Sequence, residues 1–236
     1  TNSTFTDNSA DYGAGGAILT TTVTLTNSTF TDNSAAYSGG GAISAYAAAT
    51  VTDSTFTGND AFGGGAIYTN GTAAITSSAF TNNGFGNYGG AIMAFTATVS
   101  ASTFTRNDSN FGGGIYADAT AVITASTFTS NGAIYGGGIY AGTATIARSR
   151  FTRNTAGQHG GAVYVVQATA EDFPQLRRNI FAGNRAASGG AITLRSCDAI
   201  RRSQATRVER ANRFSGNRAT EQRRTNNIER REGGCG

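Results

Sequence analysis

The side chains that could carry acid–base or metal chemistry are few and scattered in this chain of 236 residues. It has 14 acidic residues and a single histidine, His159. Asp7 and Asp32 occupy equivalent positions after a Phe-Thr pair, but Gly58 and Arg106 follow at that position. Lyases, hydrolases and epimerases of polysaccharides need clustered carboxylates, often with calcium and a base. We therefore predict no catalytic residue, no cofactor and no metal site.

The histidine stands before a Gly-Gly pair, at a position where three other repeats have an aromatic residue. We interpret His159 as a substitute for an aromatic ring on the surface of a turn, and not as a general base. The equivalent residues are Tyr88, Phe111 and Tyr135.

Cys197 and Cys235 are the only cysteines, and both lie in the irregular C-terminal third. Two sulfurs without a neighbouring histidine provide too few ligands for zinc. The pair could form a disulfide or stay reduced, and the sequence leaves both alternatives open.

A repeat of roughly 24 residues positions all of these side chains. The motif Phe-x-x-Asn occurs nine times, beginning at Phe5, Phe30, Phe56, Phe80, Phe104, Phe128, Phe151, Phe181 and Phe214. Between these motifs stands Gly-Gly-Ala/Gly-Ile/Val, ending at Ile18, Ile43, Ile67, Ile92, Ile115, Ile139, Val163 and Ile192. A small-x-aliphatic segment such as Ala121/Ile123 completes most repeats. The alternating segments predict three short strands per repeat, separated by glycine and asparagine turns.

Three short strands in each repeat predict an all-β fold, a single-stranded right-handed parallel β-helix of about nine coils. The inward Phe, Ile, Ala and Val side chains stack on their copies, because one coil cannot bury them alone. The Asn column is expected at a turn, since asparagine tolerates left-handed backbone angles and its amide can bond the next coil. Paired glycines permit the other bends.

The alternation of GGAI with FxxN resembles the repeats of chlamydial polymorphic outer membrane proteins. The resemblance covers residues 3–192 well and 193–236 poorly. It implies the β-helical passenger of an autotransporter-type surface adhesin. The cysteines that often precede the Phe in that family are missing here, which leaves attachment open. Because Thr1 falls inside a repeat, we expect the chain to be part of a longer protein.

Threonines flank the inward Phe and must point outward in two columns, here called the Thr ladder. Similar Thr-x-Thr arrays occur in insect β-helical antifreeze proteins, so ice binding is one alternative function. The other explanation is that threonine suits an exposed strand. The ladder comprises Thr4, Thr6, Thr29, Thr31, Thr55, Thr57, Thr103, Thr105, Thr127 and Thr129.

A column of tyrosines follows the Gly-Gly-Ala-Ile segment, with Met93 at the same position of one repeat. Exposed aromatic rows can stack on sugar rings and also favour protein contacts. Stacking between coils is the alternative explanation. The column comprises Tyr68, Tyr116, Tyr140 and Tyr164.

Composition changes near Val165. Residues 1–165 are regular and carry four arginines, whereas residues 166–236 carry fourteen. In this second part of the same domain, Gln167–Arg178 and Ser196–Ala211 are predicted to protrude as insertions, and the coil opened by Phe214 lacks a Gly-Gly-Ile segment. Arginine pairs could meet an anionic surface, but poor aromatic interleaving and the absence of any nucleic-acid motif argue against nucleic acid.

Together these patterns predict a non-catalytic extracellular or cell-surface module that is structural or adhesive. Its expected partners are protein or carbohydrate, with end-to-end self-association or assembly in a larger complex as a further mode. A polysaccharide-active enzyme of the lyase or epimerase type is the remaining alternative, and it would need a carboxylate cluster on the long C-terminal loops.

Overall fold

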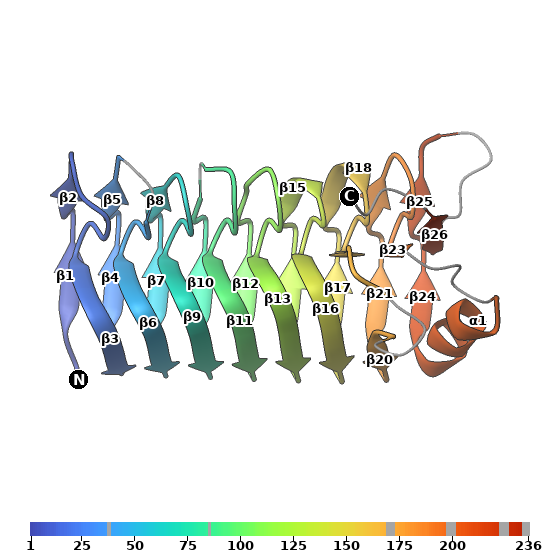
Figure 1. The fold of residues 1–236 in the computed structure, drawn as a ribbon, viewed down its shortest axis with the longest axis horizontal. Helices are drawn as coiled ribbons and strands as arrows, with labels where there is room; N and C mark the ends of the chain where they lie inside the picture. Colours follow the sequence, from blue (N-terminus) through green and yellow to red (C-terminus); the bar gives the residue numbers. More distant parts are fainter. Residues whose placement is uncertain (37–38, 85, 169–172, 197–201, 222–226, 233–236) are drawn as a thin grey trace.

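The computed structural model shows a rod of stacked coils that runs from the N-terminal strands to a helix near the C-terminal end (Figure 1). It describes residues 1–36, 39–84, 86–168, 173–196, 202–221 and 227–232. Equivalent strands of successive coils pair in parallel, which makes the fold a parallel β-helix, as the repeat predicts. In the described part of the chain, no helix has the length and apolar character needed to cross a membrane.

Three-residue strands carry the Phe column and form a nine-stranded sheet. From Phe30 to Phe181 these rings are fully buried, and neighbouring rings stack with centroids 4.7–5.0 Å apart. The strands are β1 (Thr4–Thr6), β4 (Thr29–Thr31), β7 (Thr55–Thr57), β10 (Ala79–Thr81), β12 (Thr103–Thr105), β14 (Thr127–Thr129), β17 (Arg150–Thr152), β21 (Ile180–Ala182) and β24 (Arg213–Ser215).

The prediction of three short segments per coil is wrong for two of them. In the regular coils, the Gly-Gly-Ala-Ile and small-x-aliphatic segments form one strand of nine or ten residues, with a register shift in the middle of most pairings. A bulge lets the chain bend while its backbone stays paired with both neighbouring coils. These strands are β3 (Ile18–Thr26), β6 (Ile43–Thr52), β9 (Ile67–Thr76), β11 (Ile92–Ser100), β13 (Ile115–Thr124) and β16 (Ile139–Ala147).

Short strands follow the Asn in most coils. β2 (Ser9–Ala10), β5 (Ser34–Ala35) and β8 (Asp60–Ala61) form one sheet. A second sheet contains β15 (Gly132–Tyr135), β18 (Thr155–His159), β22 (Arg185–Ala186) and β25 (Arg218–Ala219).

Asparagines that are buried in every coil except the first form a hydrogen-bonded column, here called the Asn ladder. The Asn83 side-chain amide donates to Asn107 Oδ1 (3.0 Å) and to the Phe56 carbonyl (3.0 Å). The left-handed residue of this turn is the one before the asparagine, such as Asn82 (φ 53°) or Arg106 (φ 52°). The ladder asparagines are therefore selected for their amides and not for their backbone angles. The ladder comprises Asn8, Asn33, Asn59, Asn83, Asn107, Asn131, Asn154, Asn184 and Asn217.

A second polar column, of serines, was not predicted. The serine hydroxyls connect successive coils, as at Ser102 and Ser126. The Ser126 hydroxyl accepts from the backbone N–H of Ser102 in the preceding coil, and both hydroxyls donate to the carbonyl two residues earlier in their own coil. Asn179 and Asn212 continue the column at the C-terminal end. The sequence signal for this column is the recurring Ser-Thr-Phe.

The described parts of the two C-terminal insertions pack against the β-helix, so the prediction that they protrude is wrong for these parts. β20 (Gln175–Arg177) pairs with β16 and takes the place of the second half of a long strand. The second insertion contains an unpredicted helix, α1 (Arg202–Ala211), which packs near β20 and β24. Its sequence contains no glycine or proline, and it lacks the alternation of apolar and polar residues that indicates a strand.

The last coil is completed without a Gly-Gly-Ile motif. β19 (Val163–Val165) pairs with β23 (Ile192–Ser196), and β26 (Ile228–Glu232) pairs with β23, which aligns Ile228 with Ile192. Asn227 stands where other coils have glycine or alanine, so the sequence of this coil does not carry the motif.

Candidate functional site

Two adjacent columns of rings follow one edge of the rod, and we call them together the aromatic ladder. The first column lies on the long strands, where Tyr68, Met93, Tyr116, Tyr140 and Tyr164 are paired in register. The second lies just before the glycine turn and comprises Tyr88, Phe111, Tyr135 and His159. The sequence predicts the first column and shows the aromatic residues of the second at equivalent positions. It does not predict that the two columns are in contact.

The rings of the two columns pack against one another. Tyr116 stacks on Tyr140 with centroids 5.1 Å apart, and Phe111 stacks on Tyr135 at 5.3 Å. Across the columns, Tyr88 meets Tyr116 edge-on at 4.9 Å, and Phe111 meets Tyr140 edge-on at 5.4 Å. Both arrangements are favourable for aromatic rings. The rings of neighbouring coils therefore do stack on one another, and this packing makes the ladder a rigid surface.

The ladder is open in its middle and closed at its C-terminal end. Tyr68, Tyr116 and Tyr140 are half-buried, whereas Tyr164 is only 5% exposed. The exposed part of the tyrosine column therefore spans the coils from Tyr68 to Tyr140.

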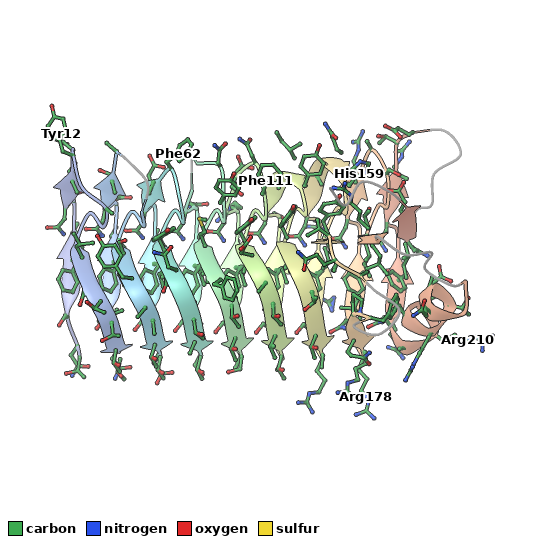
Figure 2. The ribbon with its side chains drawn as sticks, in the orientation of Figure 1. Tyr12, Phe62, Phe111, His159, Arg178 and Arg210 are labelled. Atoms are coloured by element: carbon green, nitrogen blue, oxygen red, sulfur yellow. The ribbon has the colours of Figure 1, made fainter. Side chains whose placement is uncertain are left out.

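The interpretation of His159 as a surface residue is wrong, although it does stand in the aromatic column. It is 8% exposed, and its Nδ1 lies 3.4 Å from Glu229 Oε2 on β26. Thr193 donates to the same carboxylate oxygen at 3.3 Å. The last coil, in which the sequence shows no Gly-Gly-Ile segment, supplies this acidic partner. Figure 2 shows His159 and Phe111 on the same edge of the rod, with Arg178 on the opposite edge.

Polar groups border the tyrosine column. The Tyr116 hydroxyl donates to Asp118 Oδ1 (3.1 Å), and the Tyr68 hydroxyl donates to the Asn70 side chain. Burial, together with the charge of Asp118, raises the pKa of Tyr116 above its usual value. Burial also raises the pKa of Tyr140, to about 12. Both phenols therefore stay neutral at physiological pH.

The raised pKa of Tyr140 predicts a late alkaline titration. Folded protein should ionise this phenol near pH 12, whereas unfolded protein should do so near about pH 10. Because the fold favours the neutral form, this contribution to stability is complete below about pH 10 and is lost as pH rises through the folded pKa. Tyrosinate absorbance of folded wild type and of Tyr140→Phe, recorded as pH is raised, measures the ionisation of Tyr140. Loss of a step near pH 10 in the variant would contradict the prediction.

The Thr ladder has the geometry that the sequence predicts. Its threonines are paired in register along the Phe sheet, and none is buried. Ala79 and Arg150 interrupt the first column. Ice binding stays an alternative prediction, which thermal hysteresis of the purified chain would decide.

The remaining predicted positions form no reactive cluster. Among the residues that the structure describes, no three His, Cys, Asp or Glu side chains are grouped to hold a metal ion. Asp7 and Asp32 belong to the left-handed column of the turn. Cys197 and Cys235 lie outside the described residues, so the disulfide is untested.

Comparison with protein families agrees with this architecture. A family model described as a right handed beta helix region matches residues 44–218. A model of the Chlamydia polymorphic membrane protein repeat matches residues 2–21 and 27–46, which confirms the resemblance seen in GGAI and FxxN. No curated protein and no solved structure matches the chain.

Proposed function

Because this chain belongs to the right-handed β-helix family, we propose that it is a non-catalytic extracellular or cell-surface module with a structural and adhesive role. The stacked coils supply length and rigidity. Two stretches similar to the Chlamydia polymorphic membrane protein repeat support a location at the cell surface. End-to-end association or assembly in a larger complex stays a prediction. Among the described strands, β1 and β3 are edge strands of their sheets, and an edge strand can pair with another chain.

The observation that carries the adhesive role is the open middle of the aromatic ladder. Rigid, half-buried rings offer apolar faces without a large entropic cost on binding. Carboxylate and amide groups such as Asp118 and Asn70 lie at the edge of these faces. Apolar faces bordered by hydrogen-bonding groups match the surface of a sugar, so carbohydrate is the favoured partner and protein the alternative.

Removing two rings tests this role. Tyr116→Ala with Tyr140→Ala should weaken binding to immobilised β-linked oligosaccharides about tenfold or more, because each lost aromatic contact is worth roughly 0.5–1.5 kcal/mol. Surface plasmon resonance measures the change. Tyr46→Ala is the matched control, since Tyr46 is 54% exposed and stands outside the ladder.

Circular dichroism must show that the double variant keeps its β-sheet signal. Unchanged binding by a folded double variant, or an equal loss in Tyr46→Ala, would reject the ladder as the binding face.

A further inference from the structure

The first column of the aromatic ladder is interrupted at one coil. Met93 on β11 is paired with Tyr68 on one side and with Tyr116 on the other, so a thioether stands where a phenol ring would complete the column. A methionine side chain lacks the planar width of tyrosine. The interruption coincides with a hollow of about 330 Å³, at the lower end of the usual range for ligand sites.

The walls of this hollow combine apolar surfaces with polar groups. Tyr88, Tyr116 and Met93 line it, together with Phe95. Phe95 stands at the bulge of β11, where the register shifts, and is 52% exposed. A large exposed ring next to a preformed hollow is typical of a binding site.

Two polar side chains lie on opposite sides of the hollow. Asn70 comes from the coil before Met93 and Asp118 from the coil after it. Each accepts a hydrogen bond from a ladder tyrosine, which holds it in place. A carboxylate has about four lone-pair sites, and an amide offers two N–H donors, so both retain capacity for ligand hydroxyls.

We propose that this hollow binds one neutral pyranose ring of a β-linked glycan. The inference rests on the proposed function of the ladder as a carbohydrate face. The sugar ring packs against Phe95 and Tyr116, and its hydroxyls bond Asp118 and Asn70. The Asp118 carboxylate disfavours anionic sugars through charge repulsion. On the coils of Tyr116 and Tyr140, the first column carries a ring where this coil has Met93, so the proposal places one sugar at this hollow.

Filling the hollow tests the inference. Isothermal titration calorimetry with cellotetraose and chitotetraose should give one site per wild-type chain. Met93→Tyr completes the column and should weaken the binding at least tenfold without lowering the melting temperature. Met93→Leu is the matched control, because it keeps the volume without adding a ring, and it should bind as wild type does.

Phe95→Ala gives a second measurement that does not depend on repacking, because Phe95 is exposed. It should weaken the binding at least tenfold in a fully folded protein. If Tyr140→Ala weakens binding but Met93→Tyr and Phe95→Ala do not, the ladder remains the carbohydrate face and the single subsite is wrong. If wild type binds neither tetrasaccharide, both the single subsite and the carbohydrate-binding role of the ladder are rejected.

Discussion

Replacing Asn107 by alanine is expected to destabilise the solenoid by about 3–5 kcal/mol, because the side chain satisfies several buried groups at once. Its Oδ1 accepts from the backbone N–H of Asn83 (2.9 Å) and from the Asn83 side chain (3.0 Å). Its amide donates to the Phe80 carbonyl (3.1 Å) and to Asn131 (3.0 Å). Alanine offers none of these, and a buried donor or acceptor left unpaired costs about 1–3 kcal/mol.

The Asn ladder contains its own control. Asn8 stands in the first described coil and is half-buried, so water can replace the bonds that it makes. Asn8→Ala should therefore cost less than half as much as Asn107→Ala. Urea unfolding followed by circular dichroism gives both free energies of unfolding. Equal losses in the two variants would show that the ladder does not act through buried amides.

Much of the fold could be predicted because its main determinants repeat. Phe104 and Asn107 occur in the same motif as their copies in other coils, and such periodicity leaves few alternative folds. The features that were missed depend on single coils or on contacts between coils. The contact of His159 with Glu229 joins residues seventy positions apart, and Glu229 lies in a coil without the glycine motif.

The candidate site was predictable only in part. Alternation placed Tyr116 and Tyr140 outside the core, as the structure confirms. Their edge-on contacts with Tyr88 and Phe111 depend on how the glycine turn folds one column toward the other. The position of Met93 in the column was visible in the sequence, but the hollow beside it also needs the bulge that exposes Phe95.

Phe104→Ala is expected to destabilise the chain by about 3–5 kcal/mol, the usual cost of removing a buried phenylalanine. Phe104 is fully buried, and its ring lies between those of Phe80 (4.9 Å) and Phe128 (4.7 Å). The loss should fall near the upper end of this range, because a cavity is costly where its walls cannot collapse. Here β12 is paired with β10 of the coil before and β14 of the coil after, which fixes the coil spacing, so the neighbouring rings cannot close the gap.

The same variant should change how the chain unfolds. In a solenoid each coil contacts its neighbours alone, so a weak middle coil separates two halves that can then unfold independently. Hydrogen exchange measured coil by coil should show increased opening around β12 and less change near β4 and β17. Phe5→Ala, in the half-buried first ring, should leave the middle coils protected. Uniform loss of protection in Phe104→Ala would instead mean that the nine-stranded Phe sheet unfolds as one cooperative unit.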